Sequence, residues 1–360
     1  MFVITMWLLS RLVIVVAMQL IAPLYYTPVN HSHPSLPPLG FVPDFVPKMG
    51  WELFSHWDGS WYRKIATLGY DYANDQQQHS IAFFPLFPLV TRAGMTLGVP
   101  FEVAGTLVNN LALLGALLLL YHWAEERHGI NPARWATAVL AWCPFSLFGT
   151  VTYTEGLFLL LTTAALRAFD NRQYAWAALW GAMATATRPT GVALVPTFLL
   201  VAWRESRPTI AYAAGLATGG GLLLFSVYCA IRFGDPLAFV HVQQTWHHPN
   251  WLQIFAGTLT GKNRSQVVIV FGSSYLLWRL RSKLSHVAVA YGFCSLALSL
   301  TSGAILSVER FAYGIVSLSL ALGVLLARYP YWGYALIGLF AIWLVRYAIL
   351  FAWWDWVAQG

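Results

Sequence analysis

Long apolar segments separated by polar connections run through the whole chain. A helix needs about 20 apolar residues to cross the hydrocarbon core of a bilayer. The pattern predicts an all-α polytopic membrane protein that forms a single transmembrane domain over residues 1–360. Sorted by length, the sequence gives eleven candidate spans: 2–22, 101–123, 133–150, 154–170, 173–187, 190–203, 209–232, 265–280, 286–306, 311–327 and 331–354.

Proline leaves the number of spans open at one point. Segments 173–187 and 190–203 are each short for a crossing, and Arg188-Pro189 stands between them. Because proline disfavours helix at the residue before it, we expect a break there. The alternative is one kinked helix, which would lower the count.

A second ambiguous segment covers residues 81–98. Pro85 and Pro88 interrupt it, Arg92 lies within it, and it is short. We expect an interfacial helix that lies along the outer membrane surface. The alternative is an ordinary span, which would invert every later connection.

Charged residues are scarce. The chain has 21 Lys plus Arg and 14 Asp plus Glu, a net charge of +7, yet only 10% of residues are charged and 58% are apolar. Since a soluble domain carries about 25% charged residues, neither a soluble globule nor a disordered chain is expected. The positive excess indicates membrane topology, and we expect no nucleic acid partner.

The basic residues follow the positive-inside rule. With the first residue in the cytoplasm, the opposite face receives two long polar segments, the first external loop (23–100) with its interfacial helices and the second (233–264). Ten of the 21 basic residues then fall in five short cytoplasmic connections: Arg127, Arg134, Arg167, Arg172, Arg204, Arg207, Arg279, Arg281, Lys283 and Arg328.

The first apolar segment is expected to be a retained span. No basic region precedes residues 2–22, and no small-residue cleavage site stands before Tyr25, so it does not resemble a cleaved signal peptide. Arg11 lies in the middle of this segment and should face the interior of the helix bundle.

Ionisable residues gather on the external side of this map. Charged groups near membrane spans are costly and mark functional sites. Their convergence predicts a site that opens outward, without distinguishing an enzyme from a transporter. The residues are Asp58, Glu155, Arg188, Asp235, Glu309 and Arg310.

The densest group of polar and aromatic residues surrounds Asp58. It begins at His56 and precedes a helical pattern of Tyr62, Ile65 and Ala66. Asp58 is suited to cap this helix and also to act as a general base at the membrane surface. The two roles are compatible.

Several motifs together resemble the glycosylphosphatidylinositol (GPI) mannosyltransferase 2 family, also called PIG-V. The resemblance runs over about residues 50–315. Its blocks are Trp57-Asp58-Gly59-Ser60-Trp61-Tyr62-Arg63-Lys64-Ile65-Ala66 with Gly69-Tyr70, then Ala82-Phe83-Phe84-Pro85-x-x-Pro88, Tyr153-Thr154-Glu155-Gly156-Leu157-Phe158, Thr187-Arg188-Pro189-Thr190-Gly191 and Glu309-Arg310-Phe311.

The resemblance implies a GT-C glycosyltransferase, a multispanning enzyme that takes its sugar from a polyprenyl phosphate. It implies that Asp58 in the first external loop is catalytic, and that a mannosyl group passes to a lipid-linked or glycan acceptor on the extracytoplasmic side. Eukaryotic members are considerably longer, so a compact bacterial relative in the plasma membrane is expected, with the endoplasmic reticulum membrane as the eukaryotic counterpart.

This chemistry assigns roles to the charged candidates. Arg188 and Arg310 suit the phosphate, because a planar guanidinium binds phosphate oxygens bidentately; Lys262 and Arg264 stand behind them. Alternatively, Arg310 forms only a structural ion pair with Glu309, and Arg188 only ends a helix. The further substrate-binding candidates are Glu155, Glu309, His56, Trp57 and Tyr62, although a carboxylate such as Glu155 also suits a helix N-terminus.

Metal and cofactor signals are weak. His241, His247 and His248 lie in the second external loop, but adjacent histidines on a helix point in different directions. Three cysteines in apolar runs form no disulfide or zinc pattern. We assign no cofactor and no metal site, and leave a requirement for a divalent metal open.

Two other functions compete with the transferase. A lipid or glycolipid transporter or flippase also needs intramembrane charge, but the charges lie at one face and no inverted repeat is visible. A non-catalytic membrane subunit is the third hypothesis.

Overall fold

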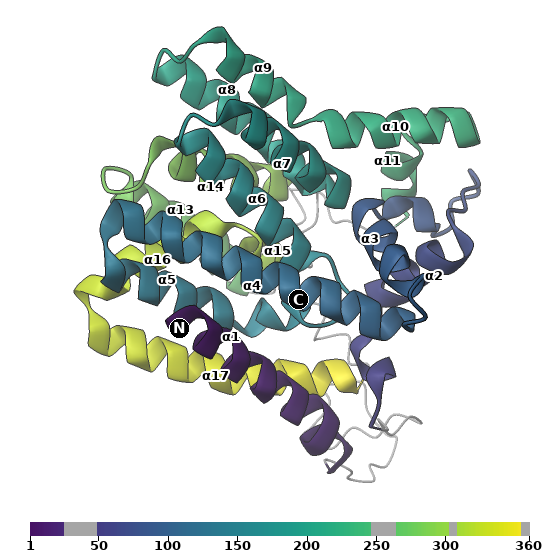
Figure 1. The fold of residues 1–360 in the computed structure, drawn as a ribbon, viewed down its shortest axis with the longest axis horizontal. Helices are drawn as coiled ribbons and strands as arrows, with labels where there is room; N and C mark the ends of the chain where they lie inside the picture. The colour runs from purple at the N-terminus through teal and green to yellow at the C-terminus, as the bar shows by residue number, and fades with distance from the viewer. Residues whose placement is uncertain (25–48, 246–263, 302–307, 354–360) are drawn as a thin grey trace.

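The computed structural model describes residues 1–24, 49–245, 264–301 and 308–353, and within these ranges the regular structure is helical (Figure 1). The elements are α1 (Phe2–Val16), η1 (Ala17–Ile21), η2 (Ala22–Leu24), η3 (Trp51–Phe54), α2 (Asp58–Leu68), η4 (Ser80–Ala82), α3 (Leu86–Met95), α4 (Phe101–His128), α5 (Ile130–Trp142), η5 (Pro144–Gly149), α6 (Glu155–Asp170), α7 (Tyr174–Thr187), η6 (Pro189–Ala193), α8 (Leu194–Arg204), α9 (Thr209–Ala217), α10 (Gly220–Phe233), α11 (Ala238–Gln243), α13 (Arg264–Leu280), α14 (His286–Thr301), α15 (Val308–Tyr313), α16 (Val316–Arg328) and α17 (Pro330–Ala352).

Helix is present within each of the eleven predicted segments. Three helical stretches are long and apolar enough to cross a membrane: Phe2–Leu24, Phe101–His128 and Pro330–Ala352. The α9–α10 pair would form a fourth, bent by 42°. The remaining segments are shorter or broken, so the count of eleven spans stays a prediction.

The structure resolves both proline-containing segments. α7 ends at Thr187, Arg188 is extended with φ −150° and ψ 143°, and η6 begins at Pro189. Two separate helices therefore form, and the single kinked helix is wrong.

In segment 81–98, α3 has 10 residues and is about 15 Å long at 1.5 Å per residue. It is too short to span about 30 Å of hydrocarbon.

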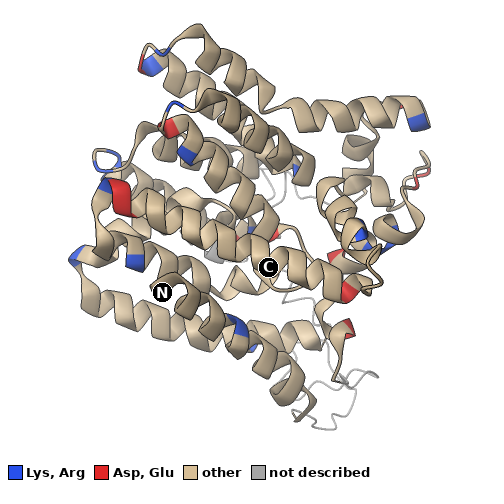
Figure 2. Ribbon diagram, viewed as in Figure 1, with Lys and Arg blue, Asp and Glu red and all other residues tan. Residues whose placement is uncertain are grey.

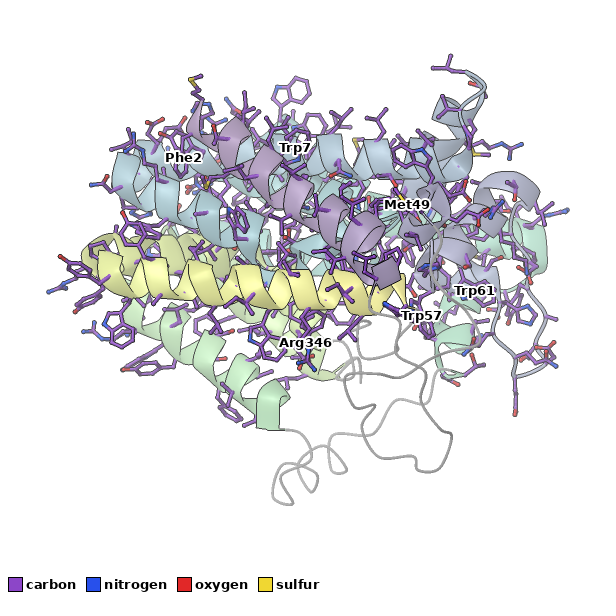
Figure 3. The ribbon with its side chains drawn as sticks, turned by 90° about the horizontal axis from the view of Figure 1, so that it is seen from below. Phe2, Trp7, Met49, Trp57, Trp61 and Arg346 are labelled. Carbon is purple, nitrogen blue, oxygen red and sulfur yellow. The ribbon has the colours of Figure 1, made fainter. Side chains whose placement is uncertain are left out.

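α4 is the central helix of the bundle. It packs against α5 and α6, α5 packs against α16, and α6 against α7. On its inner face Leu113, Leu117 and Leu120 are fully buried. Figure 3 shows α1 beside α17, with Phe2 toward one end of the molecule and Trp57 and Trp61 toward the other.

Contacts between polar side chains link the predicted cytoplasmic connections at one end of the bundle. Arg127 at the end of α4 pairs with Asp170 at the end of α6, at 2.9 Å. Glu205, after α8, pairs with His286 at the start of α14, at 2.7 Å. The described part of the first external loop, with α2 and α3, lies at the opposite end (Figures 1 and 2). The two groups of connections are separated as expected, and which end faces the cytoplasm stays a prediction.

Arg11 links α1 by hydrogen bonds to the break between α5 and η5. Its side chain is buried, as expected, and its guanidinium donates to the carbonyls of Ser146 (2.7 Å) and Ala141 (3.0 Å) and to Thr150 Oγ1 (2.7 Å). Asn110 donates to the Thr150 carbonyl at 3.0 Å. Non-helical backbone at membrane depth must find its partners within the protein, and these side chains supply them.

Asn109 completes this arrangement from α4. Its side-chain amide donates to the carbonyls of Phe148 and Val151, both at 2.7 Å, and its carbonyl accepts the Gly156 N–H at 2.7 Å. Asn109 is fully buried. One side chain therefore fixes both ends of the stretch that leads into α6.

We predict that Asn109→Leu destabilises the protein strongly. The change removes three buried hydrogen bonds, to the Phe148 and Val151 carbonyls and from the Gly156 N–H, and of these groups the Val151 carbonyl keeps a second donor, the Tyr153 N–H. A buried polar group left without a partner costs about 1–3 kcal/mol. The thermal unfolding midpoint in detergent should fall well below wild type. Asn171→Leu, at the exposed residue after α6, is the control and should leave the midpoint near wild type. Equal midpoints for the two variants would contradict this account.

Candidate active site

Asp58 is the first residue of α2, and two close contacts fix its position. Trp57 takes the N-cap position with φ +54°, a left-handed conformation that is rare for a large side chain. The Asp58 N–H donates to Tyr153 Oη at 3.3 Å. A Cβ on Gly59 would lie 2.4 Å from Thr152 Oγ1, so only glycine allows α2 this close. The N-cap residue is Trp57, so the capping role considered for Asp58 is wrong.

Four charged side chains from distant parts of the sequence meet here. Arg310 Nη1 donates to Asp58 Oδ2 at 2.9 Å, and Arg310 Nε lies 3.4 Å from Glu155 Oε1. Arg188 Nη1 donates to the same Glu155 oxygen. Arg310 therefore joins α15 to both α2 and α6, and Glu155 joins the two arginines.

The four charges differ in their exposure. The side chains of Glu155, Arg188 and Arg310 are 1%, 10% and 12% exposed, whereas that of Asp58 is 29% exposed. Buried charges are tolerated when they are paired, which these are. Asp58 is the member of the group that an incoming substrate reaches most readily.

Aromatic rings enclose the two guanidinium groups. Arg310 lies 5.5 Å from the ring centroid of Tyr153 and 5.9 Å from that of Phe311. Arg188 lies 5.2 Å from the Phe311 centroid. These distances suit cation–π attraction, which is stronger where water is excluded. The rings hold the arginines in place without neutralising them.

His56 and Trp57 precede Asp58 but differ in their surroundings. His56 is 3% exposed, and its ring centroid lies 5.5 Å from that of Phe351. Burial lowers the pKa of His56 to about 4, so the imidazole is neutral at neutral pH. Trp57 is half-buried beside Asp58. Of the two, Trp57 is the side chain a ligand can reach.

Tyr62 lies at the edge of the charged group. It is buried edge-on against Phe83 and Phe87, with centroids 5.2 Å apart in each case. Burial, and then the charge of Asp58, raise the pKa of Tyr62 above its usual value. Its hydroxyl therefore stays protonated.

Two of the predicted acidic residues lie outside the group. Arg310 pairs with Asp58 and Glu155, so the ion pair considered between Arg310 and its neighbour Glu309 is wrong. Asp235 instead accepts a hydrogen bond from Tyr72 at 2.6 Å. The predicted convergence of all six external charges therefore holds for Asp58, Glu155, Arg188 and Arg310.

The described residues contain no cluster of three or more His, Cys, Asp or Glu side chains that could hold a metal ion. His241 pairs with Asp235 at 2.8 Å. His247, His248 and Lys262 lie outside the described residues, as does the side chain of Arg264. The three cysteines are free thiols.

Sequence reasoning missed the roles of Tyr153 and Asn109. Tyr153 is 1% exposed, accepts the Asp58 N–H through its hydroxyl and lies against Arg310. It stands two residues before Glu155 in the same sequence motif. The sequence signal for Asn109 was an amide side chain inside an otherwise apolar segment. Such a side chain in a membrane helix usually forms hydrogen bonds with a neighbouring segment.

A protein-family model described as Mannosyltransferase (PIG-V) matches residues 1–205, which contain Asp58, Glu155 and Arg188. The chain belongs to the PIG-V mannosyltransferase family. GPI alpha-1,6-mannosyltransferase 2 of Homo sapiens is 32% identical over 176 residues, covering 46% of this chain and 34% of the human protein. The match thus spans about a third of that relative's length.

Solved structures place the fold of this PIG-V family member in the GT-C class. ArnT from Cupriavidus metallidurans bound to undecaprenyl phosphate is similar with a TM-score of 0.57 and 15% identity, covering 94% of this chain and 62% of ArnT. The Archaeoglobus fulgidus oligosaccharyltransferase is similar with a TM-score of 0.50 and 13% identity, covering 98% and 53%. The all-α GT-C fold predicted from the sequence is confirmed.

We predict that Gly59→Ala destabilises the protein, because the new methyl group overlaps Thr152 Oγ1. Overpacking of this kind typically costs about 1–3 kcal/mol, and the thermal unfolding midpoint should fall. Gly338→Ala in α17, where a Cβ has nothing within 4 Å, is the matched control and should stay near wild type. A wild-type midpoint for Gly59→Ala would show that α2 does not pack this closely.

Proposed function

We propose that this protein transfers a mannosyl residue from a polyprenyl-phosphate donor to a hydroxyl group of a lipid-linked or glycan acceptor. The observation that carries this proposal is the charged group at the start of α2. In it the partly exposed Asp58 is bound by Arg310, and Arg310 and Arg188 are both largely shielded from solvent. A carboxylate open to an acceptor beside guanidinium groups suited to a phosphate matches the needs of such a transfer.

The relatives support the substrate class. The family model and the human relative are described as mannosyltransferases. ArnT, which shares the fold, has been solved with undecaprenyl phosphate bound. A donor that carries mannose on a polyprenyl phosphate combines the two observations.

The proposed reaction is a single displacement at the anomeric carbon. The acceptor hydroxyl oxygen bonds to the anomeric carbon, and its proton passes to the Asp58 carboxylate. The bond from that carbon to the phosphate oxygen breaks, and the polyprenyl phosphate leaves with the bonding electrons. A positioned general base contributes about 10²–10⁴-fold to the rate of such a step.

The arginines act on the leaving group. Negative charge grows on the phosphate as the bond breaks, and a fixed guanidinium stabilises that charge more in the transition state than in the bound substrate. Arg310 donates to Asp58, so phosphate binding requires it to share its donors. Glu155 keeps both arginines in place from the N-terminus of α6.

The neighbouring side chains have supporting roles in this proposal. Trp57 offers an aromatic face to a sugar beside Asp58, and the protonated Tyr62 hydroxyl serves as a donor to substrate oxygens. His56 is too buried for direct contact and supports the turn into α2. Glu309 stands next to Arg310 in the sequence and is available to an acceptor hydroxyl.

The proposed setting is the bacterial plasma membrane, with the site on the extracytoplasmic side. The asymmetry of basic residues in short connections supports this orientation. A donor and acceptor delivered through the outer leaflet would then reach Asp58 from lipid or from the external water.

We predict that Asp58→Asn reduces mannosyl transfer by at least about 100-fold, because the amide cannot accept the proton. The assay uses purified protein in liposomes with polyprenyl-phosphate mannose. Arg310→Lys should also be impaired, since an ammonium cannot reproduce the bidentate guanidinium. Asp75→Asn, on the exposed part of the first external loop, is the control and should keep wild-type activity.

Wild-type activity in Asp58→Asn would remove the base from this proposal. If the wild-type protein transfers no sugar but moves a labelled lipid between leaflets of the same liposomes, the flippase hypothesis replaces the transferase.

We predict that a thiol introduced at Ser60 is labelled by a membrane-impermeant reagent added to intact cells, whereas one at Ser282 is not. Both serines are exposed, one in α2 and the other between α13 and α14. Ser282 should react only after the membrane is opened. The reverse pattern would invert the proposed orientation.

A further inference from the structure

A small cavity lies beside the two arginines, between η6 and α14. Its volume is about 20 Å³, and a cavity of about 10–15 Å³ is enough for one water molecule. The cavity therefore has room for a single oxygen-sized group. Its polar lining comes from Arg188, Thr190, Tyr291, Ser295, Ser299 and Arg310.

The charges on its walls have one sign. Arg188 and Arg310 both line the cavity, whereas their partners Asp58 and Glu155 do not. Within the described part of the chain no carboxylate contributes to the walls. The arginines thus separate a face with carboxylates from a face without them, and the second face favours an anion.

Hydrogen-bonding groups at the cavity lack partners. Thr190 Oγ1 is buried and has no hydrogen bond within the described residues, and Arg310 Nε has only its 3.4 Å ion contact with Glu155. A buried polar group without a partner costs about 1–3 kcal/mol, and a ligand oxygen bound in the cavity would satisfy both groups. Both groups can donate to an oxygen atom.

We propose that this cavity receives one oxygen of the donor's phosphate, with Thr190 as a phosphate-binding residue beside Arg188 and Arg310. The inference rests on the proposed function, which supplies the lipid phosphate. The size, the positive walls and the free hydroxyl donor all suit a phosphate oxygen. Ser295, on the facing side of α14, is a second hydroxyl within the same walls.

In this arrangement the donor phosphate and the acceptor lie on opposite sides of Arg310. The phosphate binds on the side of α14, and Asp58 meets the acceptor on the side of α2. A displacement needs the attacking oxygen and the departing phosphate on opposite faces of the anomeric carbon. Arg188 and Thr190 belong to one turn around Pro189, so the break between α7 and η6 brings a guanidinium and a hydroxyl to the same ligand.

The test compares two variants at Thr190 with one at Thr197, a threonine that does not line the cavity. Thr190→Val keeps the shape of the side chain but removes the hydroxyl, and Thr190→Ser keeps the hydroxyl. Thr197→Val is the matched control, because Thr197 Oγ1 donates to the Ala193 carbonyl within the helix and does not line the cavity. The probe is undecaprenyl phosphate, whose binding to purified protein is measured directly, together with KM for donor and for acceptor.

Thr190→Val should bind undecaprenyl phosphate about tenfold more weakly, in line with the loss of a hydrogen bond to a charged group, and raise the donor KM similarly. The acceptor KM of Thr190→Val should stay near the wild-type value. Thr190→Ser and Thr197→Val should bind undecaprenyl phosphate with near wild-type affinity. If Thr190→Val does not fold, Ser295→Ala replaces it, with a loss of several-fold expected.

Suppose that the wild-type protein binds undecaprenyl phosphate and transfers mannose. If Thr190→Val then binds the probe as tightly as the wild type, the cavity holds only water and the proposed site is overturned. A wild-type protein that neither binds the probe nor transfers sugar would overturn the proposed function together with it.

Discussion

The contact of Arg310 with two carboxylates is the interaction on which the site depends. Arg310 lies 2.9 Å from Asp58 and 3.4 Å from Glu155, so a single side chain brings α2, α6 and α15 together. Removing one partner of a buried ion pair costs about 3–5 kcal/mol, because the other charge is left uncompensated. Each member of the group therefore depends on the others for its pairing, and cations and anions lie side by side at the start of α2.

The rest of the bundle holds this contact in place through its irregular segments. The stretch between α5 and α6 carries Tyr153, which receives the Asp58 N–H. Arg11 and Asn109 bind the backbone of that stretch from α1 and α4. Since polar backbone inside a membrane domain needs internal partners, these side chains allow the chain to leave helix near the site.

The charged group could be predicted from the sequence, because charged residues in an apolar chain are costly and are kept where they pair or serve a function. Asp58, Glu155, Arg188 and Arg310 meet as expected, and the break at Pro189 is where proline requires it. Pair assignments failed, because adjacency in sequence says little about which side chains face one another. Neither the distant partner of Asp235 nor those of Arg310 can be read from local pattern.

The positions of the helix ends could not be predicted from the sequence either. Hydropathy marks where apolar chain lies but does not distinguish helix from a short 3₁₀ turn, so the segment predicted over 133–150 divides into α5 and η5. The support from Asn109 and Tyr153 was missed for the same reason. Their roles depend on backbone groups that become available only where the helices stop.

The most direct test is an experimental structure of the full chain with undecaprenyl phosphate in a lipid nanodisc. This account predicts phosphate oxygens within hydrogen-bond distance of Arg188 and Arg310, on the face of the arginines away from Asp58, with the Asp58 carboxylate open to the acceptor side. A phosphate bound away from Arg188 and Arg310 would contradict it.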